Sequence, residues 1–162
     1  MIIKPAIFSH PMNIKRLNVM LAEDDSDDRY FFEKALKELS IDSCLTVVHD
    51  GEELMSFLSD NPNQLPDVLF IDLNLPRKNG VECLYEIKTD EILKDLPVVM
   101  VLTTFTPDRL YEENMISLLL NIGALRFIHK TDDFEQLRQD IHQVLIGIAE
   151  NKPLPERSES YY

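Results

Sequence analysis

Six residues that could do chemistry share one feature, which is that they stand where a short apolar run ends. They are Glu23, Asp24, Asp72, Thr103, Thr104 and Lys130. In an open parallel sheet, ligands bind just outside the carboxyl ends of the strands. If the apolar runs are parallel strands, the backbone directs all six side chains to one edge of the sheet. The spacing therefore predicts a single polar site at that edge.

The carboxylates of this site predict a bound divalent cation. Glu23, Asp24 and Asp72 would repel one another, because each like-charge pair at ~4 Å costs about 4 kcal/mol at an effective dielectric constant of ~20. A divalent cation offsets this repulsion. A few hard oxygen ligands with open positions favour Mg²⁺, which keeps waters and takes phosphate oxygens. These three residues are the candidate metal ligands.

The elements that must position these residues alternate between strand-like and helical patterns. Strands are predicted at 17–22, 44–49, 67–72, 97–102 and 126–129, and helices at 29–39, 52–58, 81–88, 107–121 and 133–149. The middle strands are apolar on consecutive residues, which indicates burial on both faces in a parallel sheet covered by helices. Right-handed crossovers then make the five βα units a three-layer α/β sandwich.

The length of 162 residues and the 44% of hydrophobic residues predict one domain with its own core. We expect this domain at 17–150, an N-terminal extension at 1–16 and a flexible C-terminal tail at 151–162. Cys44 and Cys83 are too few for a disulfide scaffold, and both are predicted to lie in the core.

Charge and hydropathy exclude several classes of protein. The net charge of −13 argues against nucleic acid as a partner and against docking on anionic membranes. No apolar run reaches the ~18 residues of a transmembrane helix, and the first residues do not read as a secretory signal. We therefore expect a reduced, cytoplasmic, globular protein.

Four stretches together resemble the receiver domain of two-component response regulators. They are Val19-Met-Leu-Ala-Glu-Asp-Asp25, Asp67-Val-Leu-Phe-Ile-Asp-Leu-Asn-Leu-Pro-Arg-Lys-Asn-Gly80, Val101-Leu-Thr-Thr104 and Phe127-Ile-His-Lys130. The resemblance covers about residues 17–150. It implies a doubly wound, five-stranded parallel sheet of the flavodoxin-like order 2-1-3-4-5. The stretch from Asp72 to Gly80 most resembles small stand-alone regulators, including those that partner bacterial phytochrome-like kinases.

The resemblance assigns the acidic residues to phosphoryl transfer. It implies that Asp72 is the phosphoacceptor and that Asp24 is a direct Mg²⁺ ligand beside it. Glu23 would bind the metal through a water molecule or directly through its longer side chain. The backbone carbonyl of Asn74 would complete the protein's share of the metal site. The metal would keep the nucleophile ionised and neutralise the incoming phosphoryl oxygens.

The resemblance also assigns the residues of the conformational switch. Lys130 would pair with the acyl phosphate as a point charge. Thr103 would donate its hydroxyl to a phosphate oxygen, and Thr104 remains a rival for that role because the run before it is one residue longer than the commonest pattern. Phe127 matches the aromatic position of the family at which the side-chain rotamer changes when the threonine moves.

The implied function is that of a bacterial, stand-alone phosphoprotein that catalyses only its own phosphorylation and dephosphorylation and is not otherwise an enzyme. A sensor histidine kinase, of the phytochrome-like kind in the most similar subgroup, would supply the phosphoryl group. The protein would then signal by contact with a downstream protein target or a phosphotransfer protein. The sequence leaves open whether two copies of the protein form a homodimer.

Two other functions share part of this pattern, and the sequence departs from the family at several positions. Haloacid-dehalogenase-type phosphatases also use an Asp nucleophile with Mg²⁺, but they have a second acid where this chain has Asn74. A pseudo-receiver scaffold needs no phosphorylation, but the acid pair, the acceptor and the lysine are all intact here.

Thr131 stands where the family most often has Pro, and the stretch around 105–121 is lengthened. The acids of 25–28 are expected to cap and charge a helix.

Overall fold

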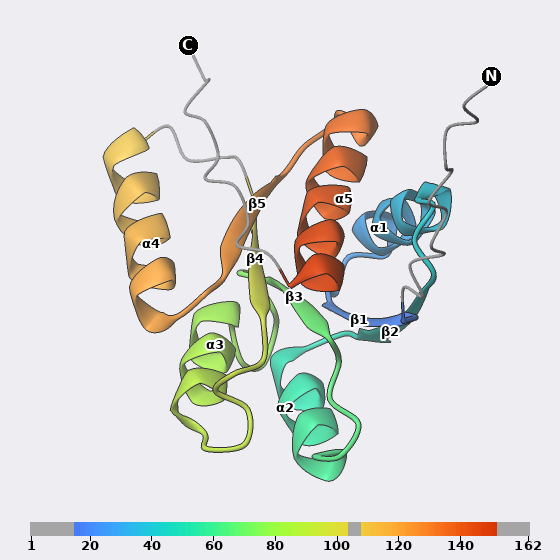
Figure 1. Ribbon diagram of the computed structural model, residues 1–162. Coiled ribbons are helices and arrows are strands. Elements are labelled where there is room, and N and C mark those ends of the chain that lie inside the picture. The colour runs from blue at the N-terminus through green and yellow to red at the C-terminus, as the bar shows by residue number, and fades with distance from the viewer. Residues whose placement is uncertain (1–14, 104–107, 152–162) are drawn as a thin grey trace, which may run out of the picture.

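The computed structural model describes residues 15–103 and 108–151, in which five strands alternate with five helices (Figure 1). The strands are β1 (Leu17–Ala22), β2 (Ser43–Val48), β3 (Val68–Asp72), β4 (Val98–Thr103) and β5 (Arg126–Lys130). The helices are α1 (Ser26–Glu38), α2 (Gly51–Asp60), α3 (Gly80–Thr89), α4 (Arg109–Ile122) and α5 (Phe134–Glu150). Each predicted element is present, with small shifts of its bounds.

The strands form one parallel sheet in the order β2-β1-β3-β4-β5. The predicted doubly wound order 2-1-3-4-5 is therefore confirmed. Helices α1 and α5 cover one face of the sheet, and α2, α3 and α4 cover the other, which makes three layers (Figure 1). In this topology the carboxyl ends of β1 and β3 are neighbours, and those of β4 and β5 follow beside them.

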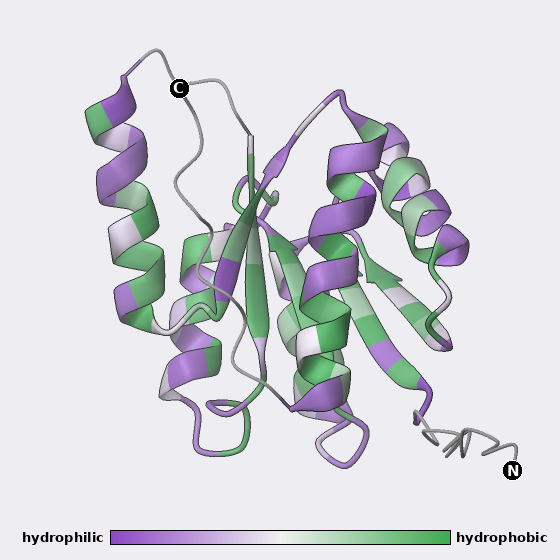
Figure 2. Ribbon diagram, turned by 45° about the horizontal axis from the view of Figure 1, so that its top comes forward, coloured by the Kyte–Doolittle hydropathy of each residue, from purple (hydrophilic) through white to green (hydrophobic). Residues whose placement is uncertain are grey.

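Two hydrophobic cores lie on the two faces of the sheet. The first core packs beneath α2, α3 and α4 and includes Leu54, Leu84 and Leu119. The second core packs beneath α1 and α5 and includes Phe32 and Ile141. Figure 2 shows strands that are hydrophobic along most of their length, between helices that carry both hydrophilic and hydrophobic residues. All five residues of β3 are buried, as expected of a strand covered on both faces.

Helix α1 begins three residues earlier than the apolar spacing predicts. Asp25 caps it, because its side chain accepts hydrogen bonds from the backbone N–H groups of Asp27 at 2.9 Å and Asp28 at 3.0 Å. A carboxylate at this position satisfies free backbone donors, and acids in the first turn complement the helix dipole. The predicted capping role of the acidic run is thus confirmed.

The loop after β3 is fixed by two glycines. The N–H of Gly51, at the start of α2, donates to the carbonyl of Pro76 at 3.3 Å, and a Cβ on Gly51 would lie 1.9 Å from the carbonyl oxygen of Lys78. At the end of the loop, the N–H of Gly80 donates to the carbonyl of Leu73 at 2.9 Å. The chain that follows Asp72 is therefore held against α2 and turned back onto its own strand.

The prediction that Cys44 lies in the core is wrong, because Cys44 is exposed whereas Cys83 is buried. Strand β2 lies at an edge of the sheet and is less covered than the middle strands. Thr104 and most of both predicted terminal segments lie outside the described residues, so the predicted domain bounds stay predictions. None of the helices in the described ranges combines the length and hydropathy that a membrane span needs.

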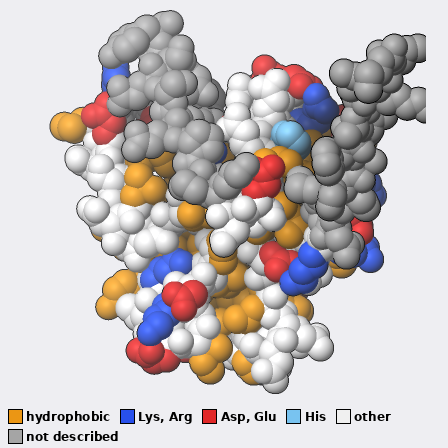
Figure 3. All heavy atoms as spheres, in the orientation of Figure 1, with side chains coloured by type: hydrophobic (Ala, Val, Ile, Leu, Met, Phe, Trp, Pro, Cys, Tyr) orange, Lys and Arg blue, Asp and Glu red, His pale blue; other side chains and the backbone are white. Residues whose placement is uncertain are grey.

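On the face shown in Figure 3, acidic and basic side chains lie intermixed. The excess of 29 acidic over 16 basic residues is therefore not gathered into one continuous acidic surface on that face.

Candidate functional site

The structure brings the three predicted carboxylates together at the carboxyl edge of the sheet. One carboxylate oxygen each of Glu23, Asp24 and Asp72 lies within 4.8 Å of the others. As whole residues, Glu23 and Asp72 are both only 2% exposed, whereas Asp24 is exposed to solvent. Neighbouring strands cause this arrangement, because Asp72 ends β3 and the other two residues follow β1 directly.

Glu23 is a buried carboxyl group held on both oxygens. Its Oε1 accepts a hydrogen bond from the N–H of Asp25 at 3.0 Å, and its Oε2 lies 2.8 Å from Nζ of Lys130. Burial raises the pKa of Glu23 to about 7, and repulsion from Asp72 adds to this, although the bonds from Lys130 and Asp25 oppose it. A proton therefore competes for this carboxylate near neutral pH.

Asp72 is also held on both oxygens, but by groups that suit a nucleophile. Its Oδ1 accepts the backbone N–H of Asn74 at 3.0 Å, and its Oδ2 accepts from Nζ of Lys130 at 2.7 Å. The N–H of Asn74 is available because the loop turns sharply after β3. The side chain of Asp72 is thus fixed in direction at the edge of the sheet.

Lys130, the last residue of β5, is the cation at the centre of the site. Its Nζ lies 2.8 Å from Glu23, 2.7 Å from Asp72 and 2.7 Å from Asp28. Burial alone would lower the pKa of Lys130, but the three carboxylates outweigh burial and raise the pKa above its ordinary value. The ammonium group therefore stays charged at neutral pH and ties α1, β1 and β3 to β5.

Two residues of this site were missed by sequence reasoning. Asp28 was assigned only a capping role, yet it reaches Lys130 from the first turn of α1. Arg29 donates from Nη1 to the backbone carbonyl of Asp24 at 2.6 Å and to that of Glu23 at 3.3 Å. Arg29 thereby holds the backbone that carries two of the carboxylates. The apolar spacing contained no signal for either contact.

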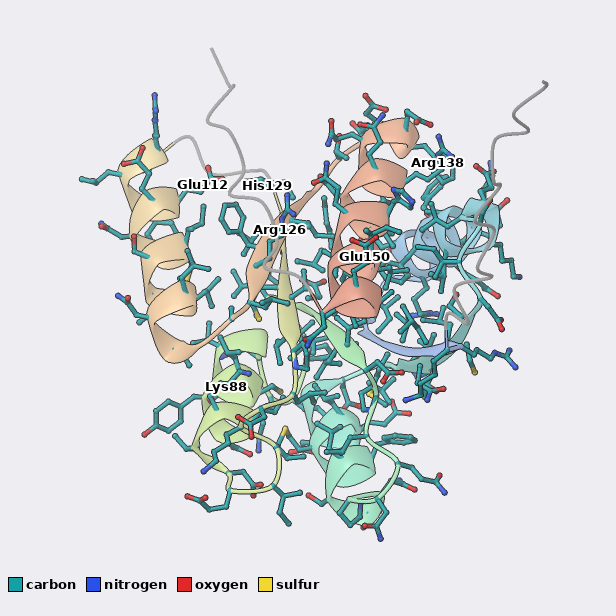
Figure 4. The ribbon with its side chains drawn as sticks, viewed as in Figure 1. Lys88, Glu112, Arg126, His129, Arg138 and Glu150 are labelled. Carbon is teal, nitrogen blue, oxygen red and sulfur yellow. The ribbon has the colours of Figure 1, made fainter. Side chains whose placement is uncertain are left out.

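The predicted switch residues lie on the neighbouring strands. Thr103 is exposed at the end of β4 and is paired in register with Lys130. Phe127 is half-buried and packs against the first core. Its ring meets the ring of His129 edge-on, with 5.5 Å between the ring centroids. Figure 4 shows His129 of β5 and Glu112 of α4 close together, and their Nε2 and Oε1 atoms are 3.3 Å apart. This contact joins α4 to the strand that carries Lys130.

The loop after β5 departs from the family pattern at Thr131. The Oγ1 of Thr131 accepts the N–H of Asp133 at 3.0 Å, and Asp133 in turn caps α5 by accepting from the N–H groups of Glu135 and Gln136. A side-chain cap therefore shapes this loop.

A small cavity lies beside Lys130, between α1, β5 and α5. Its volume is about 50 Å³, and its polar lining includes Glu23, Asp28 and Lys130. The rest of the wall is largely apolar and includes Phe32 and Ile128. The ammonium group thus lies between a carboxylate cluster and an apolar wall.

Comparison with known proteins finds relatives that match more than half of the chain. The response regulator Rcp1 from Synechocystis sp. is 36% identical over 94 residues, which are 56% of this chain and 64% of Rcp1. The chain thus spans less than two thirds of the length of this relative. The probable methanogenesis regulatory protein FilR2 from Methanothrix harundinacea is 29% identical over 133 residues, which are 78% of this chain and 79% of FilR2.

Solved structures give the same result. The phosphorylated cyanobacterial phytochrome response regulator RcpA matches with a TM-score of 0.73 at 29% identity, over 87% of this chain and 99% of RcpA. The Mn²⁺-bound form of Rcp1 matches with a TM-score of 0.71 at 27% identity, over 86% of this chain and 99% of Rcp1. The predicted likeness to phytochrome-associated response regulators is confirmed.

The model of the response regulator receiver domain matches residues 19–142, which include both carboxylate-bearing strand ends and Lys130. This match extends over most of the chain, and the sheet order is the one that the family resemblance predicts. The chain belongs to the response regulator receiver domain family.

Proposed function

We propose that this protein accepts a phosphoryl group from a sensor histidine kinase on Asp72, changes conformation and signals through protein contacts. The observation that carries the proposal is the environment of Asp72, a buried carboxylate between two further carboxylates and an ammonium group. The relative RcpA has been solved in a phosphorylated form, which supports the same chemistry here.

The transfer needs one nucleophilic oxygen and a way to stabilise charge. An oxygen of Asp72 attacks the phosphorus of a kinase phosphohistidine, the phosphorus–nitrogen bond breaks, and the imidazole keeps the electron pair. The product is an acyl phosphate on Asp72. Lys130, 2.7 Å from Oδ2, stabilises the negative charge of the phosphoryl oxygens. Water later attacks the phosphorus, which restores the carboxylate and releases inorganic phosphate.

We infer that Asp24, Glu23, Asp72 and the backbone carbonyl of Asn74 hold Mg²⁺. The donor set fits the ion, because the three side chains bring hard oxygens within 4.8 Å of one another, and one of them is solvent-facing. When bound, Mg²⁺ neutralises charge on the carboxylates and on the phosphoryl oxygens. The Mn²⁺-bound structure of Rcp1 supports a divalent cation at such a site.

The conformational change would pass from Thr103 to Phe127 and then to α4. A hydroxyl at the end of β4 can bond a phosphoryl oxygen on the adjacent strand, and this contact exists only in the phosphorylated state. Phe127 and His129 lie on β5 against α4, so a shift of the β4 end changes what α4 packs on.

The partners follow from the relatives and stay part of the proposal. The kinase is of the phytochrome-like kind, because RcpA is a phytochrome response regulator. The signal then passes to a downstream protein target or a phosphotransfer protein in the bacterial cytoplasm. The protein turns over no external substrate apart from its phosphoryl donor.

The test is phosphorylation by acetyl phosphate in the presence of Mg²⁺, followed by mass spectrometry of the intact protein. We expect one added phosphoryl group, no addition in Asp72→Asn and normal addition in Asp132→Asn, which removes an exposed acid in the loop after β5. Labelling that persists in Asp72→Asn contradicts the acceptor. Absence of any label favours the scaffold, and continuous hydrolysis of unrelated phosphomonoesters favours the phosphatase.

A further inference from the structure

The contacts of Lys130 contain one partner that the transfer chemistry does not require. An ammonium group has three N–H donors. Glu23, Asp28 and Asp72 provide three carboxylates at 2.7 to 2.8 Å from Nζ, which matches that number. A phosphoryl oxygen that binds Lys130 must therefore compete with these carboxylate oxygens for the N–H donors of the ammonium group.

The three carboxylates differ in how easily they can leave. The side chains of Glu23 and Asp72 are each 3% exposed, whereas that of Asp28 is 41% exposed. A buried carboxylate that loses its cation stays without hydration, which is costly, but an exposed one is taken over by water. Of these three contacts of Lys130, the one with Asp28 is thus lost at least cost.

The surroundings allow Asp28 to leave and keep Lys130 in place. The backbone N–H of Asp28 is anchored to the Asp25 side chain at 3.0 Å, so only the side chain of Asp28 has to turn. Glu23 is held by the N–H of Asp25 on its other oxygen. The wall of the adjacent cavity is largely apolar, so Lys130 gains nothing by turning away from the carboxylates.

We propose that Asp28 is a positioning residue that occupies, in the unphosphorylated protein, the Lys130 donor that the phosphoryl group takes over. This inference rests on the proposed phosphorylation of Asp72. Asp28 holds Lys130 only before transfer, and on transfer its carboxylate turns to solvent. The Asp28–Lys130 contact therefore stabilises the unphosphorylated state selectively and limits the fraction of protein that is phosphorylated.

The matched pair of variants is Asp28→Ala and Asp27→Ala. Both remove one acid from the first turn of α1, and of these two acids Asp28 is the one whose carboxylate lies 2.7 Å from Nζ of Lys130. We expect the steady-state ratio of phosphorylated to unphosphorylated protein, measured by intact mass with Mg²⁺ and acetyl phosphate, to be about two- to fivefold higher in Asp28→Ala than in Asp27→Ala, the range set by a partly exposed ion pair.

A double-mutant cycle separates this role from a general effect of charge or folding. In a Lys130→Ala background, the ratio of phosphorylated to unphosphorylated protein should be the same with Asp or with Ala at position 28, because the Asp28–Lys130 contact no longer exists. Equal ratios in Asp28→Ala and Asp27→Ala, a lower ratio in Asp28→Ala, or a rise that survives in Lys130→Ala would each overturn the inference. If the wild type takes no label on Asp72, the proposed function itself fails, which is a different result.

Discussion

Replacing Glu23 by Gln should change how the free energy of unfolding depends on pH in metal-free protein. Burial raises the pKa of Glu23 from 4.5 to about 7 in the folded state, and repulsion from Asp72 adds to this rise, whereas the hydrogen bonds from Lys130 and Asp25 only partly oppose it. The folded protein therefore binds more protons than the unfolded chain between these two values. Stability from this group is fully present below about pH 4.5 and is lost as the pH rises through about 7. A glutamine at position 23 carries no such dependence.

The size of the effect follows from the displacement of the pKa. One pKa unit corresponds to 1.36 kcal/mol, so a rise from 4.5 to about 7 amounts to about 3 kcal/mol over the whole range. Between about pH 5 and pH 8 the wild type should lose between about 2 and 3 kcal/mol relative to Glu23→Gln. Lys130 does not disturb the comparison, because its pKa is raised above 10.5 and the ammonium stays charged throughout.

The assay is urea unfolding of both proteins in EDTA at several pH values across this range. The contribution of ionisable groups that both proteins share cancels in the difference between the two free energies of unfolding. Parallel pH profiles would refute the argument, because they would mean that Glu23 ionises as easily in the folded protein as in the unfolded chain.

Three further outcomes are expected. Mg²⁺ at ~100 times its Kd should stabilise the wild type by about 2.7 kcal/mol in thermal unfolding, whereas Asp24→Ala should lose this response and be no less stable without metal, because the variant relieves repulsion. Thr103→Ala should still take a phosphoryl group from acetyl phosphate, but it should lose the phosphorylation-induced change in amide exchange across 108–127; an unchanged response would exclude the hydroxyl as the coupling group. Gly51→Ala should cost about 1–3 kcal/mol in urea unfolding, because its methyl group would lie 1.9 Å from the carbonyl oxygen of Lys78; wild-type stability would show that the loop after β3 can shift.

The carboxyl ends of the strands could be predicted from sequence because they depend on local pattern. Asp72 ends an apolar run that is buried at every position, and a run of that kind belongs to the middle of a parallel sheet. Once Glu23, Asp72 and Lys130 are placed at strand ends, the topology alone brings them to one edge. The meeting of Lys130 with two of the carboxylates needs no side-chain detail.

The contacts of α1 could not be predicted in the same way. The apolar spacing placed the start of this helix at Arg29, whereas the cap by Asp25 starts it at Ser26. Three residues correspond to almost a full turn, and the direction of each first-turn side chain depends on that start. The contacts of Asp28 with Lys130 and of Arg29 with the backbone before α1 therefore needed the structure. The exposure of Cys44 follows from the edge position of β2, which the predicted strand order already implied, whereas the residue type alone favoured the core.

The position of Lys130 on the last strand has a consequence for how the chain folds. Lys130 follows Asp72 by 58 residues and Asp28 by 102 residues. During synthesis, β1 and β3 leave the ribosome before β5 exists, so the carboxylates of the site can approach one another while their cation is still missing. The docking of β5 is the step that neutralises them. A partly synthesised chain therefore carries the electrostatic cost of the site by itself, and a divalent cation from solution would favour compaction of the first three strands before the lysine arrives.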